Sequence, residues 1–531
     1  MTNQINKNYL SLIFIVFISL FLSISYSIDQ QATDGGLVIS GLIRYPDDLS
    51  IMKTYYFNLY SFLHQFSSFL LKIDLTPINT SRFILFLSTL FYFLGIYLVV
   101  RSITSSTVIA LLVGLTILIF RKNFGNVDYP TLMFSDLTFS MMALSIVTLI
   151  YGLISNKNFF LIGFFSIFCV SIHPIIGLWI IFIVTLSLTI HKFFFKNIIL
   201  HKNLIYGSII GFFALFLSLF IYFQIKLDID QFISNQNAYD TYIENWDSHR
   251  IVVEDFLSSL HYPYIFKSII LIFCCAICIN HFNKIKKSYC ALTLTAVFIS
   301  ALISLFIYFL YKLNPNLFPG YLTAINPTRF VLMHSVIGIP IIISTVYILI
   351  YDIQKKNNFN FNYSKVLILI ILLLYSISHY KNILIRTESF FTNLQSDNKE
   401  DIFWQKISEL NTTGYIVTSS DWTYYHVLRK SRKPVLLNIG LMDMIPYLPY
   451  TADRIKKIIE NVYGIPFDNP PNKNVLKIPK EIVKTNFENK TTNDWNKLSK
   501  DLKIEYIITP KNWDIKLNLK FTTEKYSIYK I

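Results

Sequence analysis

The sequence has little charge for its length. Only 15% of its 531 residues are Asp, Glu, Lys or Arg, against about a quarter in soluble globular proteins, and 53% are hydrophobic. This composition excludes an ordinary soluble protein. Residues 9–385 hold nearly all the long apolar runs, whereas residues 386–531 have the composition of soluble protein. The change predicts two domains: a multi-helix transmembrane domain over 1–385 and a soluble α/β domain over 386–531.

Cysteine is also scarce, and all five cysteines lie in or beside apolar runs. Cys275 and Cys278 have the spacing of half a metal site, but they lie inside an apolar run and no second pair follows. They are interpreted as small apolar side chains of a membrane helix. The region 386–531 has no cysteine, which excludes a disulfide-stapled domain and a zinc module there.

Several functional motifs are missing as well. The C-terminal region 400–531 has no Gly-rich phosphate loop, no Walker signature and no nucleophile elbow. The net charge of +15 is not gathered in a basic patch with interleaved aromatics, so no nucleic-acid partner is predicted. Ile, Phe, Asn, Lys and Tyr outnumber Ala and Gly, which indicates an AT-rich, bacterial coding sequence.

Long apolar runs dominate what is present. A helix needs about 20 apolar residues to cross the hydrocarbon core. The first run is also compatible with a signal peptide, but its length favours a retained helix. About eleven transmembrane helices are predicted, at 9–28, 82–100, 104–120, 132–154, 158–172, 175–191, 204–225, 264–280, 290–311, 330–351 and 366–385.

Lysines in short loops predict the orientation. The loops 191–203, 281–289 and 352–365 carry nine lysines and a single acid, Asp352. The positive-inside rule places these loops and the N-terminus in the cytoplasm. An odd number of helices then places the C-terminal domain outside, on a multi-pass protein of the bacterial inner membrane.

The opposite loops carry unusual polar residues from at least four segments. The outer loop 29–81 begins with acids and continues as an aromatic stretch that is typical of a helix in the membrane interface. A carboxylate inside a span costs roughly 2.5–3.5 kcal/mol, so Asp136 is expected to face a polar cavity. The residues that converge on this side are Asp34, Arg44, Asp47, Asp48, Asp128, Asp136, His173 and Arg329. Together they predict a one-sided cavity that opens to the outside and to lipid.

Each of these residues also has a structural interpretation. Asp34 precedes Gly35-Gly36 and suits a turn, and Asp47-Asp48 suit the N-cap of the following helix. His173-Pro174 suits a helical hairpin, and Arg329 suits a snorkelling anchor. The loop 226–263 is rich in acids and aromatics, which suits sugar binding or a solvated cap over the cavity.

This layout resembles the GT-C superfamily of polytopic glycosyltransferases. The likeness rests on the acidic segment "TDGGLVISGLIRYPDD" directly after the first helix, the many spans that follow, and the outer C-terminal domain. The resemblance implies a catalytic acid in the first outer loop. Asp34 is matched to it, and the pair Asp47-Asp48 is the alternative match.

The resemblance also implies an inverting transfer from a polyprenyl-phosphate-linked sugar to a glycan, lipid or protein acceptor of the cell envelope. A first-loop aspartate would act as general base. Arg329 and His173, with Arg44 behind them, would neutralise the leaving phosphate, and Asp128 and Asp136 would line the substrate site. Asp34, Asp47 and Asp128 offer hard oxygen ligands, so a divalent metal stays open.

The C-terminal region alternates helical and strand patterns. Helices are predicted at 401–410, 421–431, 454–465 and 492–502, and strands at 413–420, 433–440, 503–510 and 520–531. This domain is expected to bind the acceptor or to support the membrane domain. Two other functions stay open: a transporter or flippase for a polysaccharide precursor, and a noncatalytic scaffold of envelope assembly.

Overall fold

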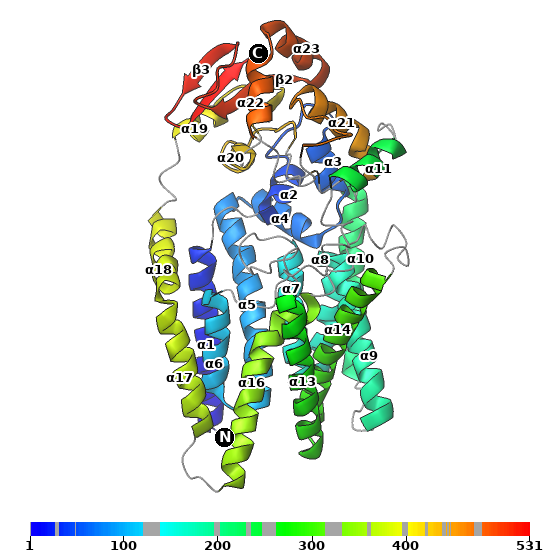
Figure 1. The fold of residues 1–531 in the computed structure, drawn as a ribbon, viewed down its shortest axis with the longest axis vertical. Helices are drawn as coiled ribbons and strands as arrows, with labels where there is room; N and C mark the ends of the chain where they lie inside the picture. Colours follow the sequence, from blue (N-terminus) through cyan, green and yellow to red (C-terminus); the bar gives the residue numbers. More distant parts are fainter. Residues whose placement is uncertain are drawn as a thin grey trace.

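The structure is a computed structural model of the chain (Figure 1). A helical bundle forms one end of the elongated molecule, and a small domain with a β-sheet forms the other. The structure describes residues 2–26, 31–47, 49–120, 139–195, 202–229, 235–246, 262–313, 332–357, 363–395, 402–419, 423–437, 442, 445, 448–471 and 480–531.

Within these residues, six helices are long and apolar enough to cross a membrane. They are α5 (Pro77–Thr104), α9 (Pro174–Ile190, continued by a π-helical turn), α10 (Lys202–Ile225), α13 (Tyr262–Lys284), α14 (Ser288–Leu313) and α16 (Leu332–Lys356). The pair α17 (Tyr363–Ser378) and α18 (Tyr380–Gln395) is bent by 66° and makes a seventh if it is one span.

Four further helices have shorter apolar stretches: α1 (Thr2–Ser25), α6 (Thr107–Phe120), α7 (Phe139–Ser155) and α8 (Phe159–Ile172). The helical membrane architecture is therefore confirmed, whereas the predicted number of about eleven spans is not. For α6 and α8 the reason is their length, because 14 residues of helix cover only about 21 Å, which is less than the hydrocarbon core.

Burial separates central from peripheral helices. Of the apolar stretch of α14, 78% is buried inside the protein. The corresponding share for α10 is 17%, and several phenylalanines of α10 are exposed on its outer side. Helix α10 packs on α8 through glycine, because a Cβ atom at Gly207 would collide with the backbone of Phe160. Close approach through small residues is the usual way in which membrane helices associate.

Helix α16 contains Pro340, which has no backbone N–H to donate to the carbonyl of Val336. The hydroxyl of Tyr92 in α5 donates to that carbonyl instead, at 2.9 Å. The hydroxyl of Tyr151 in α7 donates to the carbonyl of Met333 at 3.0 Å. Two neighbouring helices therefore hold the end of α16 that lies nearer the C-terminal domain.

A layer of three short helices separates the bundle from the C-terminal domain (Figure 1). They are α2 (Gln31–Ile39), α3 (Ile51–Asn58) and α4 (Phe62–Lys72). The stretch expected as one interfacial helix is thus two helices, capped by Ser50 and Ser61. Most of their side chains are buried against protein, so they join the bundle to the domain above it.

The C-terminal domain has a four-stranded sheet in the order β1-β2-β4-β3. Strand β1 (Tyr415–Thr418) is parallel to β2 (Ile504–Pro510), which pairs antiparallel with β4 (Tyr526–Lys530); β3 (Asn518–Thr522) completes the sheet. Its helices are α19 (Ile402–Ser408), α20 (Thr423–Arg429), a 3₁₀ turn (Pro449–Thr451), α21 (Ala452–Asn461), α22 (Lys480–Asn489) and α23 (Thr492–Leu502).

The predicted small α/β domain is therefore confirmed, with differences in detail. The expected last strand is a hairpin, β3–β4, and α22 was not predicted. The expected strand at 433–440 forms only a single bridge, between Val435 and Ile416, in the part of it that the structure describes. Pro434 has no N–H to extend that pairing.

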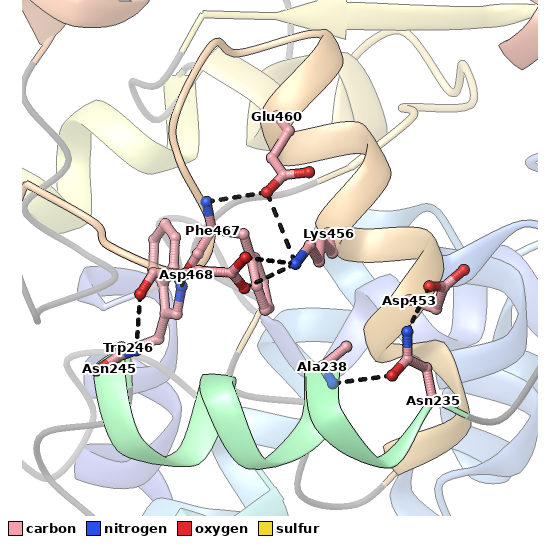
Figure 2. A network of polar contacts seen from close by, with 9 residues as sticks. All are labelled: Asn235, Ala238, Asn245, Trp246, Asp453, Lys456, Glu460, Phe467 and Asp468. Carbon is pink, nitrogen blue, oxygen red and sulfur yellow. Dashed lines mark hydrogen bonds and ion pairs between the residues drawn. The ribbon is translucent and has the colours of Figure 1, made fainter.

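The loop expected at 226–263 contains helix α11 (Gln236–Asn245), which packs on α21 (Figure 2). The indole N–H of Trp246 donates to the carbonyl of Phe467 at 2.6 Å, and Asn235 donates to Asp453 at 2.9 Å. Tyr242 and Trp246 are buried in a core that they share with the C-terminal domain, so they are not exposed for sugar stacking. His249 and Arg250 lie outside the described residues.

Residues of the segment that was predicted as the first outer loop belong to the same cores. Ile51 belongs to one hydrophobic core with Trp246 and residues of β2, and Leu37, Val38 and Met52 belong to another with residues of β1 and α19. The predicted domain boundary at residue 386, where the composition changes, lies within α18. The two cores instead contain residues from the segments 31–73, 235–246 and 402–531. These three segments together form one domain, which is called the outer domain below after its predicted orientation.

We expect Tyr92→Phe to destabilise the bundle by about 1–2 kcal/mol, because it leaves the Val336 carbonyl without a donor in an apolar surrounding. The unfolding midpoint of the detergent-solubilised protein should fall. Tyr206→Phe, on the lipid-facing side of α10, is the matched control. Equal midpoints for the two variants would contradict the role of Tyr92.

We expect Trp246→Phe to lower the free energy of unfolding by about 1–3 kcal/mol, because it removes the N–H that satisfies the buried Phe467 carbonyl. Asn245→Ala removes an exposed bond to the carbonyl of Asp468 and should have a smaller effect. Limited proteolysis between 226 and 262 would report the release of α11. A larger effect from Asn245→Ala would show that the indole does not anchor this helix.

Candidate functional site

Asp34 lies in the first turn of α2, where a carboxylate is favourable for the helix dipole. Its two oxygens accept from Arg429 of α20, Nε to Oδ1 at 2.7 Å and Nη2 to Oδ2 at 3.0 Å. The side chains are 3% and 10% exposed. The acid matched to the general base therefore forms a buried, bidentate ion pair with the C-terminal domain.

The residue next to Asp34 makes a contact between α2 and the membrane bundle. The hydroxyl of Ser81, in the first turn of α5, donates to the hydroxyl of Thr33 at 3.4 Å. Helix α2 lies between α5 and α20 in Figure 1. Asp34 is thus at the level where the apolar helices begin, directly beneath the outer domain.

Two neutral polar side chains, His64 and Tyr45, lie near Asp34. A Cβ atom at Gly35 would come within 2.6 Å of the His64 ring, so no side chain fits there. Burial lowers the pKa of His64 to about 4, which keeps it neutral at pH 7. The pKa of Tyr45 is raised well above its usual value, first by burial and then by Tyr415 and Asp34.

Asp47 makes a second contact between the first outer loop and the C-terminal domain. It accepts from the Tyr415 hydroxyl at 2.9 Å, and Arg454 and Lys503 lie 3.7 and 3.6 Å away. Its side chain is 18% exposed. Burial raises the pKa of Tyr415, and the nearby Asp47 carboxylate raises it further by a smaller amount. The N-cap of α3 is Ser50 rather than Asp47.

His173 is the N-cap of α9, and its Nδ1 accepts from the backbone N–H of Ile176 at 3.4 Å. It is 3% exposed and lies beneath the start of α4, because the Ser61 hydroxyl donates to the carbonyl of Ile172. Arg44 is exposed between α2 and α3. The other four predicted residues lie outside the described part of the chain: Asp48, Asp128, Asp136 and Arg329. The structure therefore does not test whether all eight predicted residues meet at one site.

Metal binding has no support within the described ranges, where no group of three His, Cys, Asp or Glu side chains comes together. Asp34 and Asp47 instead have arginine or lysine nitrogens at their oxygens. These two acids do not fit a divalent ion in this arrangement.

A second buried polar cluster joins α13, α14 and α16 in the half of the bundle nearer the outer domain. His334 Nε2 lies 3.0 Å from both the Tyr264 hydroxyl and the Ser268 hydroxyl. The Tyr264 hydroxyl also lies 3.1 Å from that of Ser304. A histidine within a predicted span is itself a signal for such a network, although sequence analysis did not select it.

Arg429, the partner of Asp34, was not among the predicted site residues. It occupies an ordinary helical segment, "TYYHVLR", and lies 395 residues from Asp34 in the chain. No local pattern could identify it.

Comparisons with known proteins add a distant likeness. No family model matches the chain, and no curated protein matches it. Among solved structures, the chain is similar to an oligosaccharyltransferase of Archaeoglobus fulgidus in the apo form, with 10% identity and a TM-score of 0.44. It is also similar to that protein tethered with an acceptor peptide containing the NVT sequon (11%, 0.45), and to the archaeal oligosaccharyltransferase AglB in complex with an inhibitory peptide and a dolichol-phosphate (12%, 0.36). Each comparison covers 94% of this chain and 69% of the other.

Proposed function

We propose that this protein is a membrane glycosyltransferase that transfers a sugar from a polyprenyl-phosphate-linked donor to an envelope acceptor. The observation that carries the proposal is the position of Asp34. This carboxylate lies where the membrane helices end and the outer domain begins, as the Thr33–Ser81 contact and the Arg429 ion pair define. A lipid-linked sugar would present its reacting carbon at this depth, with its chain among the bundle helices.

The chemistry needs a base on one side of the sugar and a stabilised phosphate on the other. Asp34 would take the proton of the acceptor hydroxyl while the acceptor oxygen bonds to the anomeric carbon. The bond from that carbon to the phosphate oxygen breaks, and polyprenyl phosphate leaves with the electron pair. Arg329, Arg44 and His173 remain the candidates that face this anion. Asp128 and Asp136 remain candidates for sugar hydroxyls.

Asp47 and Asp48 are the alternative for the base. Asp47 is more exposed than Asp34, but its partners Tyr415, Arg454 and Lys503 all belong to the outer domain. Within the described part of the chain, none of these contacts joins Asp47 to a membrane helix. The depth of Asp34 therefore supports Asp34 as the first choice.

The distribution of charge supports an extracytoplasmic reaction. The N-terminus, the turn at 285–287 and the inner end of α16 lie at the end of the bundle opposite the C-terminal domain (Figure 1). These segments carry lysines, as cytoplasmic segments do. We place the N-terminus in the cytoplasm of a bacterium, and Asp34 and the acceptor-binding domain outside.

Asp34→Asn should lower sugar transfer by roughly 10²–10⁴-fold, the usual contribution of a general base. The assay uses proteoliposomes that contain polyprenyl-phosphate-linked glucose, mannose or galactose with a labelled sugar. It measures label transferred to a membrane extract. Asp240→Asn, an exposed acid of α11, is the matched control and should keep full transfer.

Membrane content and unfolding midpoint are measured for each variant, because Asp34→Asn also removes an ion pair. Full transfer by Asp34→Asn, Asp47→Asn and Asp48→Asn alike would refute base catalysis by these acids. Loss of transfer by Asp47→Asn alone would move the base to the second acid.

A further inference from the structure

Arg429 fixes the orientation of Asp34 as well as its charge. Its Nε and Nη2 each bind a different oxygen of the carboxylate, at 2.7 and 3.0 Å. A side-on pair of this kind restricts the plane of the carboxylate, which a single lysine contact would not do. Rotation of the Asp34 side chain is therefore coupled to the position of the guanidinium.

The outer domain in turn fixes Arg429. The hydroxyl of Ser431 donates to the carbonyl of Trp404 at 3.1 Å, and the His426 ring packs on the Trp404 ring at 5.1 Å. The N–H of Lys433 donates to the carbonyl of Val427 at 3.3 Å. Helix α20 therefore moves with the domain core, and the partner of Asp34 is placed by the domain rather than by the membrane bundle.

Three described groups near Asp34 on the other packed elements are neutral at pH 7. The loop before α3 contributes Tyr45, α4 contributes His64 beside Gly35, and α5 contributes the Ser81 hydroxyl beside Thr33. Tyr56 of α3 packs edge-on against His64. Among these described contacts, Arg429 supplies the positive charge that favours the ionised carboxylate.

We propose that Arg429 is the positioning residue for Asp34, through which the outer domain controls sugar transfer. Arg429 keeps the carboxylate ionised and correctly oriented only while α20 is docked on α2. Transfer then depends on the docked domain even though Arg429 does not touch the sugar. This inference rests on the proposed function, in which Asp34 is the base.

Arg429→Gln should lower kcat on the order of 10²-fold, because a misplaced base loses its reacting geometry. The Michaelis constant for the polyprenyl-phosphate-linked hexose should change little. The midpoint of the acidic limb of the rate should move to higher pH, since loss of the cation makes the carboxylate easier to protonate. Arg429→Lys should return that limb toward wild type. Arg432→Gln, exposed three residues further on, is the matched control.

A second readout does not require activity. Carbodiimide coupling of an amine, followed by mass spectrometry, should label Asp34 faster in Arg429→Gln than in wild type or Arg432→Gln. A folded Arg429→Gln protein with wild-type kcat and acidic limb would overturn the inference, and so would unchanged labelling. A lower unfolding midpoint without a shift of the limb would show a structural role alone.

The two proposals fail separately. An active Asp34→Asn variant removes Asp34 from catalysis and ends the proposed base mechanism. An inactive Asp34→Asn variant beside a fully active Arg429→Gln variant leaves that mechanism standing and refutes the positioning role.

Discussion

The ion pair between Asp34 and Arg429 is the constraint on which the arrangement of this molecule depends. Both charges are taken from water, which is unfavourable unless each is met by the other with good geometry. Removing one partner of such a pair typically costs about 3–5 kcal/mol, because the other charge stays buried. The outer domain therefore docks on α2 in an orientation that brings the two side chains together.

The ion pair can couple the outer domain to the membrane bundle because this domain is not built from the C-terminal region alone. Its cores take Ile51 and Met52 from the first outer loop and Tyr242 and Trp246 from α11. Asp47 adds a second polar contact with Tyr415. The segments between membrane helices thus serve as structural parts of the domain. A displacement of the outer domain would therefore move Arg429 away from Asp34.

The bundle supplies the fixed base for this assembly. Pro340 leaves a carbonyl of α16 free, and Tyr92 of α5 satisfies it. Helix α5 also meets α2 through Ser81 and Thr33. Helix α5 therefore stabilises α16 within the bundle and also contacts α2, the helix that contains Asp34. A chain of contacts runs from the bundle through α5 and α2 to α20.

The sequence by itself determined the features that depend on local composition and periodicity. Apolar runs located the membrane helices, lysines in short loops predicted an orientation, and local patterns located α19, α20, α21, α23, β1 and β2. The same patterns selected Asp34 as an unusual residue. They could not determine how many helices form full spans, since helix ends depend on packing.

Only the tertiary structure decided which groups meet. Arg429 becomes the partner of Asp34 across 395 residues, His173 caps α9, and Trp246 is buried in a domain core rather than exposed. Periodicity carries no information about these contacts, because each depends on where distant segments pack and which groups lose water there. The sequence could propose that Asp34 is reactive, but its burial and its ionic partner follow from the fold alone.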